Sequence, residues 1–404
     1  MKIPELLAPA GNFEKLKTAL HYGADAVYMG LSDFSLRAKA DNFSEEELKD
    51  AVRLVHQKGK KLYITLNIFP HNKDIFLIKE HLSFLKKISP DGLIISDPGI
   101  LEMASELTPD IPVHISTQAN ITNCRSAGFW EKSGAKRLVL SRELTIEEIK
   151  EIRDNVSLEL ECFVHGAICI SYSGRCYVSS FLSNRSANRG ECANSCRWNY
   201  ALMEEKRPGE YMPVYENDKG TYVMSSRDLC MLEHLDKLAH AGVNSFKIEG
   251  RMKGINYVAG VVKTYREAVD ALKSRPYRIK KEWLREIAMF SSRGYTTGMF
   301  FGKQPDAGYN HDEEYVYRMS HEFVGIVQSV SNGKAGIALR NTLKTGDSIE
   351  FLSTGLENKA FKVTEISDAA GVPLDSGRNE ETVFIPVQNG VRENDLVRRP
   401  LKIK

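Results

Sequence analysis

The sequence has no apolar run long enough to cross a lipid bilayer. Its longest apolar stretches, such as Gly92–Ser96, have the length of a single strand. The chain opens with Met1-Lys2-Ile3-Pro4-Glu5 and lacks the apolar core and cleavage site of a secretory signal peptide. These two absences predict a cytoplasmic protein with no membrane partner.

The sequence also lacks an excess of charge, because 55 lysines and arginines against 53 aspartates and glutamates leave a net charge of +2. Nucleic-acid binding would therefore depend on local basic segments. One such segment is Lys273–Arg285, in which Tyr277 and Trp283 are interleaved with basic residues, and the other is a tail with Arg392, Arg398, Arg399, Lys402 and Lys404. Phosphate contacts and base stacking would need such residues, but a run of charge is usually a solvated surface.

Seven cysteines are present, and disulfides are rare in a reducing cytosol, so metal binding or catalysis is expected. Cys124 and Cys162 stand apart, and we predict that both are small buried apolar side chains. The others are grouped in the middle of the chain: Cys169, Cys176, Cys192, Cys196 and Cys230. We predict that most of these five bind an iron–sulfur cluster.

Two other kinds of metal site fit the cysteine spacing less well. Structural zinc sites favour ligand pairs with two to four residues between them, and only Cys192 and Cys196 are spaced in this way. Radical S-adenosylmethionine enzymes typically use Cys-x3-Cys-x2-Cys, but Asn199 occupies the third ligand position here. The spacing therefore favours iron–sulfur over zinc and argues against radical chemistry.

A cysteine protease is a weaker alternative, with His165 as the base and Cys169 as the nucleophile. No third residue that would orient the histidine can be recognised. The sequence also has no His-Glu-x-x-His metalloprotease motif and no Gly-x-Ser-x-Gly elbow.

Short aliphatic strands alternate with amphipathic helices through the first two-thirds of the chain. The expected strands are 6–10, 26–30, 61–66, 92–97, 113–118, 137–141, 158–165 and 245–249, and the expected helices include 12–23, 44–58, 145–154 and 257–272. Eight strands in this alternation predict a TIM-like (β/α)8 barrel, with a doubly wound α/β fold as the weaker alternative.

The regular spacing is interrupted once, by an insertion over 166–244 that holds all five clustered cysteines. Long insertions in compact domains are usually functional or disordered, and the cysteines argue for function. Within it we expect a strand at 222–225 and a helix at 232–241. The predicted domains are 1–275, a catalytic barrel with this insertion, and 317–404, a small β-barrel of short strands separated by Gly and Asn turns, joined by a linker over 276–316.

Polar residues follow the predicted strands, at the end of the barrel where such enzymes carry their chemistry. They are Asn12, Arg37, Asn67, Asp97, Gln118, Asn120, Ser141, Arg142, Glu143, His165, Glu249 and Arg251. Any single one of them is more typical of a helix cap or a solvated loop, so it is their recurrence that predicts a site.

Several motifs resemble the U32 peptidase family, also called collagenase-like. They are Glu161–Cys169 continued by Gly174–Ser179, Glu5–Gly11, Ser116–Ala119, Gly190–Cys192, Ser226–Cys230 and Lys247–Arg251. The resemblance extends over most of the chain, which is thereby identified as a member.

The family name implies proteolysis. Many members, however, are oxygen-independent hydroxylation proteins, and they resemble one another in carrying a [4Fe–4S] cluster. The four ligands of that cluster match Cys169, Cys176, Cys192 and Cys230, which leaves Cys196 as a spare thiol.

A chain with a C-terminal β-barrel resembles the tRNA-hydroxylating branch of this family. That likeness implies formation of 5-hydroxyuridine at the wobble position, in the anticodon stem-loop, with prephenate in place of dioxygen as the source of the hydroxyl group. Lys344–Phe351 and Glu393–Arg398 resemble the second-domain β-barrel of translation factors, which favours an RNA partner. A collagenase-like peptidase is the alternative function.

Two carboxylates on the hydroxyl donor call for paired cations. We select Arg37, Arg142, Arg251 and Lys253 for this role because of their predicted place after the strands, with His165 and Glu249 as further catalytic candidates. Ion pairs of these cations with Glu143 or Glu249 are the structural alternative. The sequence leaves open whether the cluster is catalytic or structural.

Overall fold

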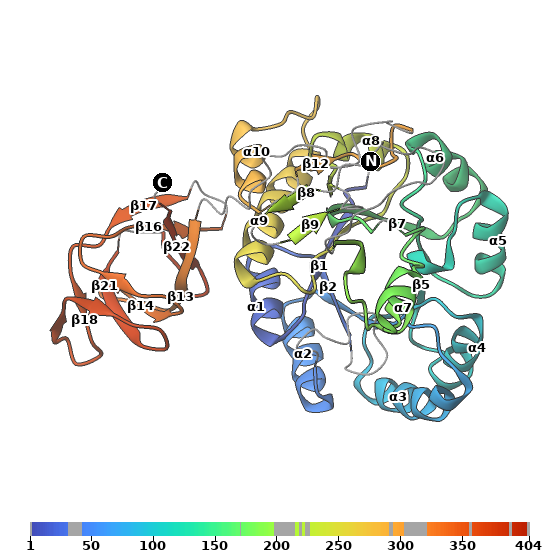
Figure 1. Cartoon of the computed structure of the whole chain (residues 1–404), viewed down its shortest axis with the longest axis horizontal. Helices are drawn as coiled ribbons and strands as arrows, with labels where there is room; N and C mark the ends of the chain where they lie inside the picture. Colours follow the sequence, from blue (N-terminus) through green and yellow to red (C-terminus); the bar gives the residue numbers. More distant parts are fainter. Residues whose placement is uncertain are drawn as a thin grey trace.

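The computed structural model describes residues 2–30, 43–169, 171–197, 215–217, 220–222, 227–290, 294–302, 321–354, 358–387 and 390–401. Figure 1 shows a large α/β domain beside a smaller all-β domain that carries the C terminus. Among the helices in these ranges, none is both long and apolar enough to cross a membrane.

The large domain is a closed parallel barrel, as predicted. Its strands are β1 (Glu5–Pro9), β2 (Ala26–Gly30), β3 (Lys61–Leu66), β4 (Gly92–Ile95), β5 (Val113–Ile115), β6 (Arg137–Val139), β7 (Glu159–Ala167) and β11 (Ser245–Ile248). Each strand pairs in parallel with the next, and β11 closes the barrel by pairing with both β7 and β1. Aliphatic side chains on the outer face of the strands pack against the surrounding helices.

Five of the seven barrel helices within the described ranges, all but the third and the last, follow a residue whose side chain caps them. The seven are α1 (Phe13–His21), α2 (Glu45–Gln57), α3 (Ile75–Ile88), α4 (Pro98–Leu107), α5 (Cys124–Lys132), α6 (Ile146–Asn155) and α9 (Ile255–Ala271). Ser44 and Thr145 form capping boxes, while Asn12 and Asp97 cap α1 and α4. Asn12 and Asp97, two of the polar residues predicted at the site, are therefore helix caps.

Two strands that the sequence did not predict extend the barrel sheet, one in the insertion and one beyond it, in the segment predicted as a linker. β10 (Asp228–Cys230) pairs antiparallel with β7, and β12 (Tyr295–Thr296) pairs with β10. The other elements of the insertion are α7 (Val178–Ser183), the 3-10 helices η3 (Ala187–Arg189), η4 (Ser195–Arg197) and η5 (Leu232–His234), the hairpin β8 (Tyr215–Asn217) with β9 (Gly220–Tyr222), and α8 (Leu235–His240). The expected helix at 232–241 is thus η5 followed by α8, and most of the strand expected at 222–225 lies outside the described residues.

The segment predicted as a linker contains a helix, α10 (Lys281–Ala288), which packs on α9. Trp283 is only 3% exposed, and its ring nitrogen donates to Glu267 at 2.8 Å. Trp283 is therefore not available for base stacking, the functional interpretation of this basic segment, because the amphipathic helix places its ring in the core. The boundaries at 275 and 317 stay a prediction.

The C-terminal domain is an antiparallel half-barrel whose main sheet has the order β17-β16-β22-β13-β14-β21-β18-β19. The strands are β13 (His321–Ser331), β14 (Lys334–Leu339), β15 (Leu343–Lys344), β16 (Ser348–Leu352), β17 (Lys359–Lys362), β18 (Ile366–Ser367), β19 (Pro373–Leu374), β20 (Ser376–Gly377), β21 (Thr382–Pro386) and β22 (Leu396–Pro400). Its inner face is a separate aliphatic core.

The two domains share buried contacts. The Tyr22 hydroxyl donates to the Leu352 carbonyl at 2.7 Å and accepts from the Leu396 amide at 2.9 Å. Arg398 is buried and makes two hydrogen bonds to Glu286 of α10, at 2.6 and 2.9 Å. Arg398 was expected in a basic RNA-binding tail, but it instead joins the two domains, and Lys402 and Lys404 lie outside the described residues.

Candidate functional site at the barrel mouth

The lower half of the barrel interior is closed by buried ion pairs. Arg137 contacts Glu5 at 2.7 Å, Glu159 at 2.6 Å and Glu161 at 3.0 Å, and Lys247 contacts Glu161 at 2.7 Å. Although burial raises the pKa of Glu161, Lys247 and Arg137 together hold that pKa below its usual value. The N-terminal end of the barrel is therefore a closed floor.

Arg251, which follows β11, reaches across the barrel mouth, by which we mean the loops after the C-terminal strand ends. Its guanidinium donates to the Thr65 hydroxyl of β3 at 3.1 Å, and the residue is 4% exposed. A Cβ atom on Gly11 would lie 2.4 Å from the Arg251 carbonyl oxygen, so the first loop needs a glycine here. Arg251 is thus a cation fixed within the mouth.

Arg142 enters the mouth from the loop after β6. Its guanidinium carbon lies 4.1 Å from the centre of the Phe163 ring, and it donates to the Ala167 carbonyl at 2.7 Å. The same ring lies 5.3 Å from the amine of Lys247, which also lies 4.5 Å above the Tyr28 ring. Phe163 and Tyr28 thus separate the paired charges of the floor from the cations of the mouth.

The remaining cation and acid candidates have different positions. Glu249 lies 3.3 Å from the Tyr28 hydroxyl, which itself donates to the Ile248 carbonyl. Lys253 lies over the Tyr257 ring at 5.4 Å. Glu143 accepts the backbone amide of Ser173 at 2.6 Å and its hydroxyl, so it anchors the insertion. Arg37 lies outside the described residues.

Three buried polar atoms on the loops after β5 and β6 have no hydrogen-bond partner within the part of the chain that the structure describes, namely Gln118 Nε2, Asn120 Oδ1 and Ser141 Oγ. The amide nitrogen of Gln118, after β5, and the hydroxyl of Ser141, after β6, belong to residues that are 1% and 3% exposed. Buried polar groups are nearly always paired, and an unpaired one costs free energy. Such groups at the functional end of a barrel are suited to a polar substrate.

His165 does not face the mouth as the sequence suggested. The pairing of β7 with β11 shifts register between Lys247 and Ile248, so His165 lies opposite Ile248. Because of this irregularity, the His165 side chain points to the opposite face of the sheet from the one that strict alternation along β7 would give. The His165 ring lies among Tyr257, Tyr265 and Tyr295. Burial lowers the pKa of His165 to about 3, so the ring stays neutral. Its position argues against pairing with Cys169, whose side chain is exposed.

The five clustered cysteines lie on several elements of the insertion. Cys230 ends β10 opposite His165, and its sulfur lies 3.7 Å from the Tyr265 hydroxyl. Cys192 accepts the backbone amide of Asn194 at 3.4 Å. Cys169 is exposed, and the other four are half-buried. Of the two separate cysteines, Cys162 is buried as predicted, whereas Cys124 is half-buried at the start of α5.

The thiols suit an iron–sulfur cluster in their chemistry but not in their positions. Thiolates are the usual ligands of such clusters, and four of them must converge on one point. Over the described ranges, no three histidine, cysteine, aspartate or glutamate side chains are grouped so as to hold a metal ion. We therefore derive no chemical step through a cluster, and the assignment of Cys169, Cys176, Cys192 and Cys230 as ligands stays a prediction.

Residues 171–197, which we call the cysteine lobe, are docked on the mouth. Arg189 makes two hydrogen bonds to Asp74, at 2.6 and 3.1 Å, and this pairing lowers the pKa of Asp74 to about 2. Arg175 donates to the Gln118 carbonyl at 2.7 Å, and the Phe69 amide donates to Asn188 at 3.0 Å. The lobe is therefore fastened to the loops after β3 and β5, in addition to Glu143 after β6.

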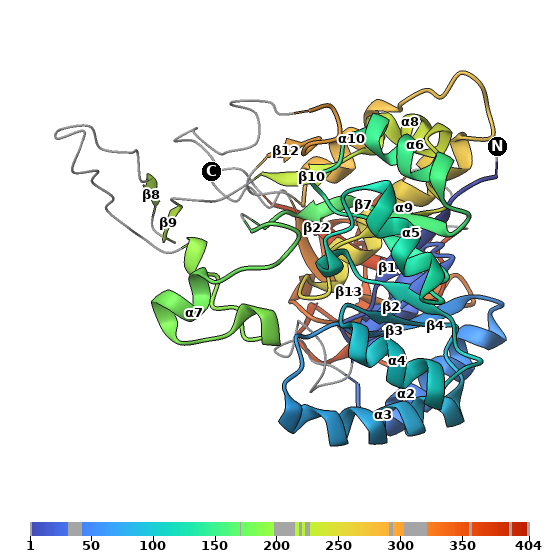
Figure 2. The same cartoon turned by 90° about the vertical axis from the view of Figure 1, so that its right-hand side faces the viewer.

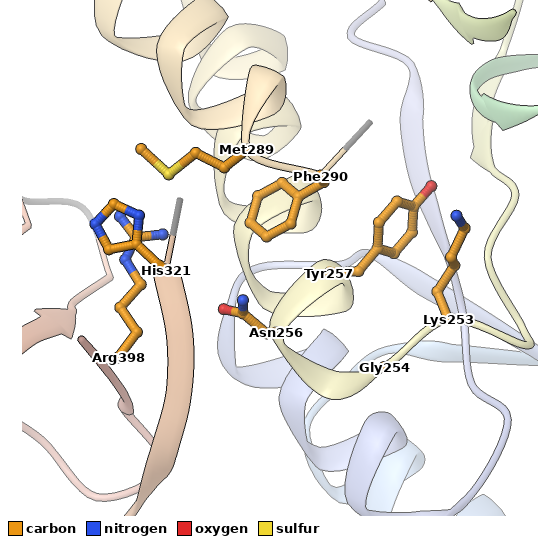
Figure 3. Close-up of a pocket in the computed structure, with 8 residues that line it drawn as sticks. All are labelled: Lys253, Gly254, Asn256, Tyr257, Met289, Phe290, His321 and Arg398. Atoms are coloured by element: carbon orange, nitrogen blue, oxygen red, sulfur yellow. The ribbon is translucent and has the colours of Figure 1, made fainter. Parts of the chain in front are cut away.

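A pocket of about 140 Å³ lies where the loop after β11 meets the C-terminal domain. Figure 3 shows the Phe290 ring above Asn256, with Tyr257 on one side of it and His321 and Arg398 on the other. Gly260 allows this arrangement, because a Cβ atom there would lie 2.3 Å from the ring. Lys253 is thus part of a pocket between the domains.

Sequence reasoning missed three residues that shape the mouth, Tyr28, Thr65 and Phe163, and one residue of the floor, Lys247. Each lies inside a barrel strand, and only the alternation of side chains along β2, β3, β7 and β11 could have identified them. Lys247 and Arg251 belong to the same motif, Lys247–Arg251, but a sequence motif does not indicate which of its residues face the barrel interior.

Comparisons with known proteins agree with this architecture. The family model of peptidase family U32 matches residues 11–310, and that of its C-terminal domain matches residues 319–398. The chain is 40% identical over 384 residues to tRNA hydroxylation protein P1 of Bacillus subtilis (strain 168), covering 94% of this chain and 90% of the relative. It is 36% identical over 435 residues to tRNA hydroxylation protein P of Escherichia coli (strain K12), covering 97% and 95%. An uncharacterized protease of Methanocaldococcus jannaschii is 40% identical over 414 residues, covering 98% of both chains.

Proposed function

The chain belongs to peptidase family U32, and from this membership we propose that it hydroxylates tRNA, forming 5-hydroxyuridine at the wobble position with prephenate as the hydroxyl donor. Relatives that match nearly its whole length are named tRNA hydroxylation proteins. The observation that carries the proposal is the barrel mouth, where Arg142 and Arg251 lie at the same end of the barrel as the unpaired polar groups of Gln118 and Ser141.

The two arginines suit a dicarboxylate donor. Guanidinium groups bind carboxylates through two parallel hydrogen bonds, and both arginines are held in place, Arg142 on Phe163 and Arg251 on Thr65. The floor beneath them cannot supply this charge, because Lys247 and Arg137 are paired with Glu161. We propose that Arg142 and Arg251 each bind one carboxylate and so orient the donor hydroxyl toward the base.

Gln118 and Ser141 suit the uracil. A wobble nucleotide must leave its stack before its C5 atom is accessible, and a base in an anticodon loop is readily extruded. The amide of Gln118 can donate to a uracil carbonyl oxygen, and the hydroxyl of Ser141 can donate or accept. Replacing C5–H by C5–OH oxidises the base by two electrons, so the donor that gives up its hydroxyl oxygen is reduced by two electrons.

Mass spectrometry of tRNA nucleosides tests the reaction. Cells that lack this protein should lose 5-hydroxyuridine and its derivatives, and cells complemented with the gene should regain them. Unchanged nucleosides would overturn the proposal. For the donor, purified protein in the absence of dioxygen should transfer the label from prephenate carrying oxygen-18 in its hydroxyl group, and an unlabelled product would reject prephenate.

We also propose that a [4Fe–4S] cluster binds to Cys169, Cys176, Cys192 and Cys230. Protein purified without air should contain about four irons per chain, and alanine at any of these positions should remove most of them. Cys196→Ala provides the matched control, because it lies in the same part of the chain and should keep its iron. A protein without iron, or a Cys196→Ala variant that loses it, would reject this ligand set.

The peptidase alternative has less support. Its required pair, His165 and Cys169, consists of a neutral ring buried among tyrosines and an exposed thiol. Proteolysis by purified protein that survives loss of Cys176 and Cys230 would favour it over the hydroxylase.

A further inference from the structure

The cysteine lobe exposes large apolar side chains on and beside its short helix. Phe181 is 79% exposed, Tyr177 74%, Tyr172 55% and Leu182 42%. Single exposed apolar residues are common on protein surfaces, but a group within a few residues of each other marks a binding surface. Figure 2 shows that α7, which carries this group, projects beyond one end of the barrel.

Tyr177 and Phe181 lie on the same face of α7. They are four residues apart, and the Phe181 amide donates to the Tyr177 carbonyl at 2.9 Å, which places the rings one helical turn apart. The helix is well supported, since Ser179 accepts the backbone amide of Ala193 at 2.8 Å, and Asn184 ends it in the left-handed conformation. The two rings are therefore presented by a fixed element.

The lobe is also the most basic part of the insertion that the structure describes. Its 27 residues contain four arginines, Arg175, Arg185, Arg189 and Arg197, and a single acid, Glu191, which gives a net charge of +3. Asp74, outside the lobe, pairs with Arg189 and reduces this net charge to +2, which still equals the net charge of the whole chain, so positive charge is concentrated here. Arg175 is exposed and lies two residues before Tyr177. Exposed rings beside arginines are typical of surfaces that bind single-stranded nucleic acid.

The position of the lobe connects this surface to the mouth. Arg175 donates to the carbonyl of Gln118, the residue whose side-chain amide is unpaired at the mouth. Ser173 is bound by Glu143 from the loop after β6. A strand of RNA that placed one nucleotide in the mouth would therefore have its neighbours close to the lobe.

We propose that Tyr177 and Phe181 form a stacking platform for unpaired nucleotides that flank the target base, with Arg175 contacting the phosphate between them. This inference rests on the proposed function, because it takes an RNA loop as the substrate. It commits to RNA because the rings lie on a lobe that is docked on the mouth, where the extruded nucleotide would be held, and because exposed rings beside arginines are typical of surfaces that bind single-stranded nucleic acid.

The test compares Tyr177→Ala/Phe181→Ala with a matched control, Phe76→Ala/Phe129→Ala. Phe76 and Phe129 are 68% and 58% exposed on α3 and α5, so the control removes similar rings from the outer helices. Binding of unmodified tRNA by fluorescence anisotropy should be roughly 100-fold weaker for the platform variant and unchanged for the control. Tyr177→Trp/Phe181→Trp should restore binding.

Salt dependence separates stacking from charge. The platform variant should keep the wild-type slope of log Kd against log salt, whereas Arg175→Ala should lower that slope by about 1. Platform and control variants that bind tRNA equally well would overturn the proposal. So would a platform variant that changes the oligomeric mass of the protein but not its RNA affinity, since the face would then bind a second copy.

The nucleoside assay keeps this proposal separate from the proposed function. If wild-type protein restores 5-hydroxyuridine and the platform variant does so as efficiently as the control, the platform fails and the function stands. If the wild-type protein makes no 5-hydroxyuridine, but the platform variant binds tRNA more weakly than the wild type, the proposed function fails and the platform stands.

Discussion

At the N-terminal end of the barrel, Arg137, Lys247 and Glu161 are buried and paired with one another or with Glu5. At the C-terminal end, the amide of Gln118 and the hydroxyl of Ser141 are just as buried, yet neither has a partner among the residues that the structure describes. The buried polar groups named at the N-terminal end of the barrel therefore have partners, whereas those named at the C-terminal end do not have one among the described residues. His114, inside β5, is an exception on the floor side, because its Nδ1 atom has no hydrogen-bond partner among the described residues and burial lowers its pKa to about 3.

The difference shows how to distinguish buried polar residues that stabilise a fold from those that await a substrate. A paired charge in the interior already has its interaction, so removing one partner leaves the other unsatisfied and destabilises the protein. An unpaired buried group contributes nothing favourable to stability, so its removal should harm only binding. Variants at the two ends should therefore separate stability from activity.

Glu161→Ala should have the largest effect on stability. It leaves Lys247 without its partner and takes one of three carboxylates from Arg137, which should lower the free energy of unfolding by about 3–5 kcal/mol. Urea unfolding followed by circular dichroism measures this. Glu159→Ala is the matched control, because Glu159 also binds Arg137 but its side chain is 43% exposed, and it should cost less than about 1 kcal/mol. Equal stability of the two variants would contradict the closed floor.

Arg251→Ala should lower tRNA hydroxylation by about 100-fold, because a cation fixed across the mouth is lost from the donor site. Its iron content should match that of the wild type. Arg251→Lys should recover only part of the activity, since an ammonium group cannot bind a carboxylate through two parallel bonds. Single-turnover formation of 5-hydroxyuridine is the measurement, and activity within threefold of wild type would exclude Arg251 from the site.

Acid should loosen the docking of the cysteine lobe. Arg189 lowers the pKa of Asp74 from 3.8 to about 2, so the ion pair stabilises docking fully above about pH 4 and is lost as the pH falls toward 2. Asp74→Asn should loosen the lobe by about 2 kcal/mol and remove its dependence on pH in that window. Hydrogen exchange over 171–197, with α4 as internal reference, would show this. A lobe whose protection is unchanged in Asp74→Asn would contradict the assignment.

The smallest effects come from a pair of buried serines at opposite ends of the barrel. The Ser245 hydroxyl donates to Glu5 at 3.0 Å, so Ser245→Ala should cost about 1 kcal/mol of stability and leave activity unchanged. Ser141→Ala should cost no stability but slow hydroxylation by about tenfold. If both serines affected stability equally, the distinction between the two ends would not hold.

The barrel could be predicted from the sequence because its signals are local. The capping boxes of Ser44 with Glu47 and of Thr145 with Glu148 join residues three apart, and both helices begin where these pairs indicate. The aliphatic strands between such helices then allow few arrangements other than a parallel barrel. The candidate site was only partly predictable: Arg142 and Arg251 lie at the mouth, whereas His165 does not.

The sequence by itself therefore determined the alternation of strands and helices, the helix ends and the grouping of cysteines in one insertion. Only the tertiary structure decided which polar residues are partnered, because partners such as Arg137 and Glu5 or Ser245 and Glu5 are distant in the chain and meet only when the barrel closes. It also decided on which side His165 lies, since one irregularity in the pairing of β7 reverses a side chain without any mark in the sequence. Trp283 likewise lies in a run of basic residues, and only the packing of α10 on α9 showed that its ring is buried.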